Sequence, residues 1–393
     1  MATVKGTRSI VFGRERPSHR PGFPLSVTPT RDTHYRDLPP PTGPEPFHLD
    51  LKDIVSPQTY RAIERSRKLT FHVNGDMGGI NYAVPQELVA AGMESDAKQP
   101  GGAASKPAFL YILGDCVYFN GETSKYYEQF YHPYEFYLGP IFAVPGNHDG
   151  ENLPGQNNLD GFLRNFCAPK PVKLPESGDS QRTVMIQPNV YWTLLTPLVS
   201  IVGLYSNVPE GGELRAPQTD WLVKELKSLP KNRPLLVALH HPTYSADDHH
   251  SGSIHMKEAL ENAAEAAGRH PEMILAGHVH DYQRLSKQRS DGTTVPYLVA
   301  GAGGYHNLHY IRKVNGQKMI PPVAFDDKEN DPVTLERYSD DHHGFLRLEV
   351  TNKLITGRYY TVPRPQDPFS KGNQLIDYFE FDWKQKKYIP NVL

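Results

Sequence analysis

Short apolar runs, each followed at once by glycine and polar residues, recur along the chain from about residue 69. The five clearest runs are LTFHV (69–73), PAFLYIL (107–113), PIFAV (140–144), RPLLVAL (233–239) and EMILA (272–276). Apolar runs of this length that end at turn residues are typical of buried β-strands. Amphipathic segments at residues 219–229 and 256–268 lie between these runs and predict helices. Strands interleaved with helices indicate an α/β domain, in which ligands gather at the carboxyl ends of the strands.

The last part of the chain has a different pattern, because apolar and polar residues alternate there. The segments are GFLRLEV (344–350), ITGRYYTV (355–362) and LIDYFEFDWK (375–384). Alternation with a period of two predicts antiparallel strands with one face toward the core. We therefore expect mixed β-sheets within one large domain that spans residues 66–393.

Residues 1–65 are rich in proline and show little apolar periodicity. Such a segment favours turns and extended backbone over a packed core of its own. We expect an N-terminal arm that wraps over the domain or over a partner subunit, or else a disordered tail. The first alternative would allow an oligomer to form through the arm.

Composition limits the possible classes of protein. The chain has 393 residues, of which 38% are hydrophobic and 22% charged, and this suits a folded domain with a sizeable core. A formal net charge of −2 gives no signal for nucleic acid or for a membrane surface. The sequence has no apolar run near the roughly 20 residues that cross a bilayer, and no signal-peptide core near its start. With only two cysteines as well, we expect a cytoplasmic protein, with an exported and processed form as the alternative.

Residues that can bind metal ions follow all five of the early strands. In chain order they are Asp76, Asp115 with Tyr118, Asn147, His240, and His278 with His280. Each is an ordinary turn residue when taken alone, but the carboxyl ends of the strands are expected to meet at one rim. Carboxylate, amide, phenolate and imidazole ligands suit iron, manganese and zinc. Seven ligands exceed the needs of one ion, and two adjacent ions that share a carboxylate are suited to phosphoryl transfer.

The same residues lie in five motifs of a known family. The motifs are D-x-G at 76–78, G-D-x-x-Y at 114–118, G-N-H-D at 146–149, V-x-x-H at 237–240 and G-H-x-H at 277–280. Together they resemble the purple acid phosphatases, which belong to the calcineurin-like metallophosphoesterases. The resemblance also includes Tyr282 and the GAGG at 301–304, and it covers nearly all of the chain except the arm. Tyr118 is the distinguishing residue, because other members of the superfamily generally lack this tyrosine and have a histidine where this chain has Gly78.

The resemblance implies a fold and a set of ligands. The expected fold is a four-layer αββα sandwich of two mixed β-sheets flanked by helices. Two metal ions are implied: Fe(III) in the first position, and Fe, Zn or Mn in the second. The ligands implied for the first are Asp76, Asp115, Tyr118 and His280. The ligands implied for the second are Asp115, Asn147, His240 and His278, with Asp115 bridging.

The resemblance also implies an activity. The expected protein is a phosphomonoesterase in which a metal-bound hydroxide attacks the phosphorus of a phosphate ester. His148 would bind the phosphoryl group, and Asp149 would orient the ring of His148. A phosphodiesterase that uses the same metals is the alternative enzyme. A non-enzymatic metal-binding scaffold is a third hypothesis, which predicts that at least one ligand is missing, and none is.

The stretch LHHPTYSADDHH (239–250) contains two further candidates. The family has histidines nine and ten residues after the V-x-x-H ligand, and here these positions are His249 and His250. They would contact phosphate oxygens and protonate the leaving group, which suits imidazole at its ordinary pKa. His241 has no family role. Asp247 and the residue after it either tune the histidine pair or are simply exposed.

Several other polar residues have weaker signals. Cys116 is predicted to pack, because its side chain points away from the ligands in an alternating strand end. His306 and His309 either line the cleft or are structural, and His342 and His343 are expected to be structural.

Overall fold

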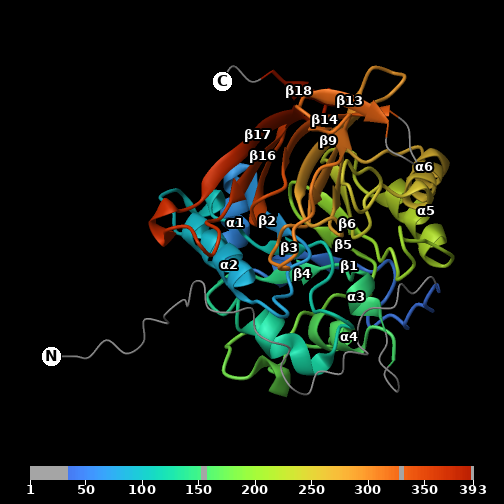
Figure 1. Cartoon of the computed structure of the whole chain (residues 1–393). Helices are drawn as coiled ribbons and strands as arrows, with labels where there is room; N and C mark the ends of the chain where they lie inside the picture. The colour runs from blue at the N-terminus through green and yellow to red at the C-terminus, as the bar shows by residue number, and fades with distance from the viewer. Residues whose placement is uncertain (1–33, 152–156, 327–331, 391–393) are drawn as a thin grey trace.

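Two large β-sheets face each other in the computed structural model, which describes residues 34–151, 157–326 and 332–390 (Figure 1). In spatial order, the nine-stranded sheet consists of β1 (His48–Asp50), β5 (Trp192–Leu195), β6 (Ser200–Gly203), β7 (Leu235–Leu239), β8 (Met273–Ala276), β10 (Thr294–Ala300), β9 (Tyr282–Gln288), β14 (Pro332–Ser339) and β13 (Val323–Asp326). The seven-stranded sheet consists of β18 (Lys387–Ile389), β17 (Gln374–Asp382), β16 (Leu354–Thr361), β15 (Gly344–Thr351), β2 (Lys68–Asn74), β3 (Leu110–Ile112) and β4 (Ile141–Ala143). A small hairpin pairs β11 (Lys313–Val314) with β12 (Gln317–Lys318).

The five predicted early strands are all present as β2, β3, β4, β7 and β8. They form parallel pairs within each sheet, and every residue of β7 is buried, which explains why it reads as a continuous apolar run. The three C-terminal strands pair antiparallel, as their alternation predicts. Both sheets are therefore mixed. The sequence does not reveal that the five early strands are divided between two sheets.

Helices cover the outer faces of the two sheets (Figure 1). On one side lie α1 (Pro57–Ser66) and α2 (Val84–Ala97), and on the other lie α5 (Gln218–Ser228) and α6 (Ile254–Ala267). Two shorter helices are α3 (Asn147–Gly150) and α4 (Asp160–Phe166). The ends of α6 follow ordinary capping chemistry, since Ser253 accepts a hydrogen bond from the backbone N–H of Met256 and Gly268 ends the helix at φ 62°. The predicted four-layer αββα sandwich is confirmed.

The core lies between the sheets and is rich in aromatic contacts. Tyr111 on β3 stacks on Trp192 on β5, with ring centroids 6.0 Å apart. Farther along the sandwich, Tyr282 on β9 stacks on Tyr359 on β16 at 3.8 Å. These pairs join strands of different sheets, so they fix the distance between the sheets and hence between the loops at their ends.

Part of the predicted N-terminal arm contributes to this domain. Residues 1–33 lie outside the described residues, but β1 pairs parallel with β5 at the edge of the nine-stranded sheet. The indole of Trp221 donates a hydrogen bond to the carbonyl of Pro46, and the backbone of Arg36 pairs with the side chain of Asn207. The domain boundary at residue 66 and a role of the arm in oligomers stay predictions. None of the helices in the described ranges has the length and apolar character needed to cross a membrane.

Candidate metal centre

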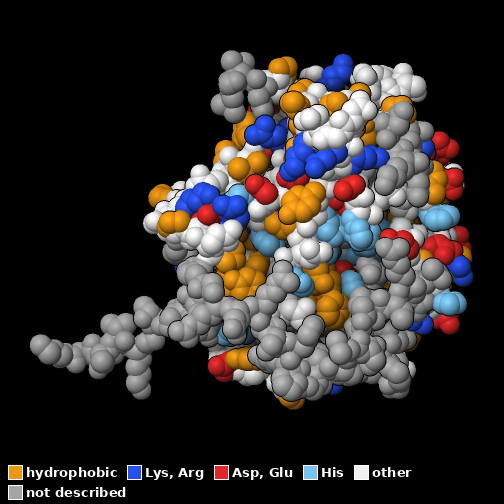
Figure 2. Space-filling view, viewed as in Figure 1, with side chains coloured by type: hydrophobic (Ala, Val, Ile, Leu, Met, Phe, Trp, Pro, Cys, Tyr) orange, Lys and Arg blue, Asp and Glu red, His pale blue; other side chains and the backbone are white. Residues whose placement is uncertain are grey.

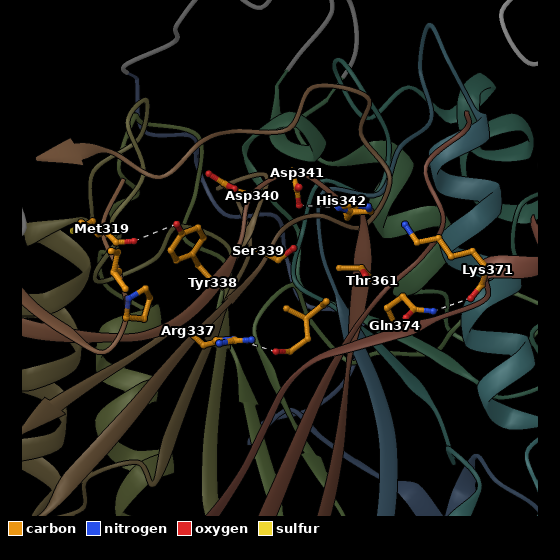
Figure 3. A pocket seen from close by; sticks show the side chains of 13 residues that line it. Met319, Arg337, Tyr338, Ser339, Asp340, Asp341, His342, Thr361, Lys371 and Gln374 are labelled. Carbon is orange, nitrogen blue, oxygen red and sulfur yellow. Dashed lines mark hydrogen bonds and ion pairs between the residues drawn. The ribbon is translucent and has the colours of Figure 1, made fainter. Parts of the chain in front are cut away.

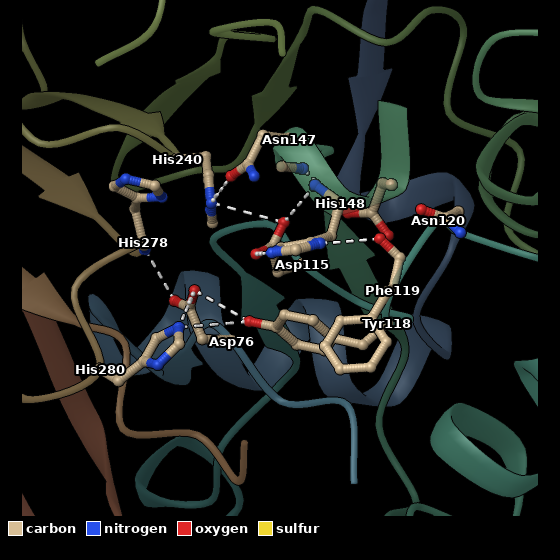
Figure 4. Close-up of polar contacts among 12 residues, drawn as sticks. Asp76, Asp115, Tyr118, Phe119, Asn120, Asn147, His148, His240, His278 and His280 are labelled. Carbon is tan, nitrogen blue, oxygen red and sulfur yellow. Dashed lines mark hydrogen bonds and ion pairs between the residues drawn. The ribbon is translucent and has the colours of Figure 1, made fainter. Parts of the chain in front are cut away.

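The predicted ligands lie at one rim of the sandwich, just past the carboxyl ends of strands from both sheets (Figure 4). After β2, β3 and β4, the seven-stranded sheet supplies Asp76, Asp115, Tyr118 and Asn147. After β7 and β8, the nine-stranded sheet supplies His240, His278 and His280. Histidine side chains gather in the middle of one face of the molecule (Figure 2). The centre is thus assembled from loops that are far apart in the sequence.

Three of the four ligands expected for the first metal form a tight cluster. The Tyr118 hydroxyl lies 3.3 Å from Asp76 Oδ1 and 3.4 Å from His280 Nε2, and these last two atoms are 3.4 Å apart. All three side chains are buried. Burial, with the charges of Asp115 and Asp76, raises the pKa of Tyr118 well above its ordinary value. A phenolate at this position therefore requires positive charge beside it.

Two of the ligands expected for the second metal, Asn147 and Asp115, lie beside His240. Its Nε2 atom lies 3.0 Å from Asn147 Oδ1 and 3.4 Å from Asp115 Oδ1. Donor atoms of Asp76, Asp115 and His240 all lie within 4.8 Å of one another, which joins the two clusters through the carboxylates. The ring of His278 is 5.1 Å from that of His240, and its backbone N–H donates to Asp76 Oδ2 at 2.8 Å.

The orientation of the histidine rings fits metal binding. Nδ1 of His240 faces the carbonyl of Leu113 at 2.8 Å, and Nδ1 of His280 faces the carbonyl of Asn307 at 2.9 Å. A carbonyl oxygen can only accept, so Nδ1 carries a hydrogen in each case and Nε2 is the nitrogen that faces the cluster; once the ring has lost its second proton, Nε2 can offer a lone pair to a metal ion. The rim therefore brings together acceptor atoms from both sheets that face one another.

Such a group of acceptors attracts a cation. Burial opposes protonation of His240, but the carboxylates of Asp115 and Asp76 outweigh it and raise the pKa of His240 to about 9. Burial also raises the pKa of Asp76 to about 7. Both shifts report a deficit of positive charge among buried oxygen and nitrogen atoms. The donor set and its electrostatics fit two hard to borderline metal ions.

The backbone around the ligands is held in unusual conformations. Asp76, Asp115 and His278 have positive φ angles of 56°, 53° and 67°, which L-residues rarely adopt and which cluster at functional sites. A Cβ atom added at Gly146 would lie 2.1 Å from Asp115 Oδ1, and one at Gly78 would lie 2.6 Å from Cδ2 of Tyr118. The glycine in D-x-G thus leaves the space that the ring of Tyr118 fills.

His148 and Asp149 differ from the expectation in one respect. Nδ1 of His148 donates to the carbonyl of Phe119 at 2.7 Å, so a backbone group orients the ring (Figure 4). Asp149 instead accepts backbone N–H bonds from Cys116 at 3.1 Å and Gly146 at 2.9 Å. The expectation that Asp149 orients His148 is corrected accordingly, because its carboxylate is used to join the loops after β3 and β4. The Nε2 atom of His148 lies 4.0 Å from Asp115.

The loop after β7 brings His249 and His250 beside the centre. The ring of His250 lies 4.4 Å from that of His278, and its Nδ1 is 3.2 Å from a carboxylate oxygen of Glu210. Asp247, for which the sequence left two alternatives, is buried with 1% of its surface exposed. His309 also lies here, with its ring 4.3 Å from that of His280. Sequence reasoning left His309 open, since its only signal was its place after a strand end.

The remaining candidates are not among the predicted ligands, and of these the ring of His241 lies 4.3 Å from that of His278. His241 is buried, with Nδ1 2.7 Å from the Ser206 hydroxyl. Cys116 is buried in the hydrophobic core. The ring of His343 is buried and donates from Nε2 to the carbonyl of Tyr305. His306 is exposed and contacts the Tyr305 ring, and His342 pairs with Asp341.

A cavity of about 500 Å³ lies near the same rim, between β14 on one side and β16 and β17 on the other (Figure 3). Polar, charged and apolar side chains line this cavity, among them Tyr338, Ser339, Thr361, Arg337 and Lys371. Among the described residues, two groups of side chains lie close enough to share a metal ion: Asp76 with Asp115 and His240, and Glu210 with His250 and His278. Neither group belongs to the lining of this cavity. The chemistry of the rim therefore lies beside this cavity and not in it.

Comparisons with known proteins agree with this fold. Residues 69–282 match the sequence model of the calcineurin-like phosphoesterases. A probable purple acid phosphatase of Arabidopsis thaliana is 30% identical over 177 residues, which are 42% of this chain and 38% of that protein. A 3',5'-cyclic-nucleotide phosphodiesterase of Nostoc sp. is 36% identical over 105 residues, which are 25% of this chain and 31% of that protein. The matches thus span less than two fifths of either relative.

Solved structures share the fold at low sequence identity. A purple acid phosphatase from yellow lupin seeds superposes with a TM-score of 0.56 and 16% identity, over 80% of this chain and 54% of that one. GAP50, the anchor in the inner membrane complex of Plasmodium, superposes with a TM-score of 0.54 and 16% identity, over 81% of this chain and 90% of that one.

Proposed function

The chain belongs to the calcineurin-like phosphoesterase family, and from this premise we propose that it hydrolyses phosphomonoesters with two metal ions. The observation that carries the proposal is the cluster of acceptor atoms at the rim. Side chains from five separate strand ends bring carboxylate, phenol, amide and imidazole groups within reach of one another. A group of this kind suits two metal ions that share a carboxylate.

The proposed ligand sets are those that the family motifs predict. Asp76, Asp115, Tyr118 and His280 would hold the first ion, which we propose to be Fe(III). Asp115, Asn147, His240 and His278 would hold the second ion, which we propose to be Fe, Zn or Mn. When bound, two such ions supply Lewis acidity that activates water and neutralises charge on the phosphoryl oxygens.

The side chains around the centre have distinct proposed tasks. His148 is held by the carbonyl of Phe119 with its other nitrogen toward Asp115, and this orientation supports the proposal that it contacts a phosphoryl oxygen. The ring of His250 packs beside that of His278, and the ring of His249 lies 4.6 Å from that of His250. Their proposed role is to contact the phosphate and to give a proton to the leaving alkoxide.

Removal of a ligand tests the proposal directly. Asn147→Ala and His240→Ala should each lower kcat at least about 100-fold, since even indirect support of a metal ligand is often worth 10- to 100-fold. His132→Ala, a surface histidine beside Glu135, serves as the matched control and should keep wild-type turnover. Unchanged turnover in both ligand variants would refute a metal-dependent mechanism. Metal analysis and an absorption spectrum of the purified protein would identify the ions.

A second candidate function is hydrolysis of phosphodiesters. The similarity to a cyclic-nucleotide phosphodiesterase favours it, because that protein's name gives a diester substrate. Rates on p-nitrophenyl phosphate and bis(p-nitrophenyl) phosphate separate the two. We expect a larger kcat/KM for the monoester, and a preference for the diester would replace our first choice.

A further inference from the structure

Two loops that are far apart in the sequence pair beside the metal centre. Asp247 forms an isolated β-bridge with Ile311, and the backbone N–H of Asp248 donates to the carbonyl of Tyr310 at 2.9 Å. The second loop is also tied to a predicted ligand, because the backbone N–H of His309 donates to the carbonyl of His280 at 3.0 Å. This pairing brings His309 beside His249 and His250 of the first loop.

One buried carboxylate contacts all three of these histidines. Oδ2 of Asp247 accepts the backbone N–H of His249 at 3.1 Å and that of His250 at 2.7 Å. The same oxygen lies 3.2 Å from Nδ1 of His309. Asp247 thus sets the backbone of one histidine pair and the ring of a third histidine on the other loop.

The three rings form a second row of imidazoles beside the row of predicted ligands. The ring of His309 lies over that of His280, with centroids 4.3 Å apart and planes inclined by 34°. It is 5.2 Å from the ring of His249 and 5.1 Å from that of His250. His250 in turn lies 4.4 Å from His278. A substrate held at the predicted ligands would meet this wall.

We propose that His309 contacts the phosphoryl group of the substrate and that Asp247 is the positioning residue that holds this wall. The inference rests on the proposed hydrolysis of phosphomonoesters and names a further residue that would favour a monoester over a diester. A monoester leaves three oxygens of the phosphoryl group without an ester substituent, whereas a diester leaves two. In a monoester, a third imidazole can contact the third unsubstituted oxygen. In a diester, that oxygen carries the second organic group.

A loop cap is the structural alternative for Asp247. An aspartate commonly accepts the N–H groups two and three residues ahead of it, and such a cap needs no partner on another loop. The contact between Asp247 and His309 distinguishes a positioning residue from a loop cap, because a loop cap does not need that contact. The 3.2 Å approach of Nδ1 of His309 to Asp247 is an ion-pair contact without hydrogen-bond geometry, and neither that nitrogen nor the other oxygen of Asp247 has a hydrogen-bond partner among the described residues.

The test compares two substrates with the same leaving group, p-nitrophenyl phosphate and methyl p-nitrophenyl phosphate. His309→Gln should lower kcat/KM for the monoester roughly 10- to 100-fold, which is typical of a lost hydrogen bond to a charged group, and lower that for the diester less than about 3-fold. An equal loss on both substrates, or no loss on either, would overturn the assignment of His309. If the wild type hydrolyses neither substrate, the proposed function itself fails.

A double-mutant cycle tests Asp247. Asp247→Asn keeps an oxygen for the two backbone N–H groups but removes the charge beside His309, so it should fold and should lower monoester kcat/KM. In the His309→Gln background the same substitution should have an effect of less than about 2-fold, because partners in one network are not additive. Full additivity of the two substitutions would show that Asp247 does not act through His309. Thermal unfolding and metal content of both variants should match the wild type.

Discussion

Gly78 gives the sharpest test of how the tyrosine is accommodated at the rim. In Gly78→Ala, the new Cβ would lie 2.6 Å from Cδ2 of Tyr118 and 2.4 Å from Oε1 of Gln129, whereas ordinary contacts begin at 3.4 Å. The ring would have to move by about 0.8 Å or more, but it is stacked on Tyr305 at 4.2 Å and lies 4.6 Å from the ring of His148. Gln129 is equally constrained, since it accepts from the backbone N–H of Tyr118 at 2.9 Å and donates to its carbonyl at 2.8 Å.

Overpacking of a filled core of this kind costs about 1–3 kcal/mol. After a chelator has removed any bound metal, urea unfolding should therefore give Gly78→Ala a free energy of unfolding that is lower by that amount. The slope of this free energy against urea concentration should be unchanged. Gly102→Ala is the matched control, because a Cβ there meets no atom within 4 Å, and it should change the unfolding free energy by less than about 0.5 kcal/mol. Equal unfolding free energies for Gly78→Ala and the wild type would refute the packing argument.

Three further predictions concern other parts of the molecule. Tyr118→Phe should abolish visible absorption of the iron-loaded protein while far-UV circular dichroism stays unchanged; retained absorption would mean that the phenol is no ligand. Burial lowers the pKa of His343 to about 4, so only the unfolded chain binds this proton as pH falls below about 6.5, and stability decreases toward pH 4. In His343→Gln, urea unfolding between pH 7 and pH 5 should lose roughly 2 kcal/mol less than in the wild type, and an identical loss would contradict the assignment. Asp377→Ala should destabilise the protein by roughly 3 kcal/mol in urea, because it leaves the half-buried Arg284 without the carboxylate that it contacts at 2.7 and 3.0 Å, and a change below about 1 kcal/mol would show that the pair contributes little.

The strand ends and their ligand types could be predicted because both are local in the sequence. A buried strand such as β7 is a continuous apolar run, and the residue after it, His240, is at the rim for that reason alone. The resemblance to the family motifs then names the remaining predicted ligands. The alternation of apolar and polar residues in β15 and β16 is local in the same way, because one face of each strand packs on the core.

The rest depends on contacts between distant segments. Asp247 and His309 meet only because two loops pair across 62 residues, and nothing in the periodicity of either loop indicates a partner. The ring of His148 is oriented by the carbonyl of Phe119, a backbone group that a side-chain motif cannot encode. The pairing of β1 with β5 is likewise invisible locally, because β1 is three residues long and lies in a proline-rich segment.

The division of the ligands between two sheets has a consequence for folding. Acceptor atoms from β2, β3 and β4 face acceptor atoms from β7 and β8 across the seam of the sandwich. A cation bound there would link the two sheets, since neither sheet could unfold without releasing it. Its binding free energy is therefore added to the unfolding free energy of both sheets at once. Amide hydrogen exchange at the ends of β2 and β7 should slow together as metal is added, although these strands share no hydrogen bond.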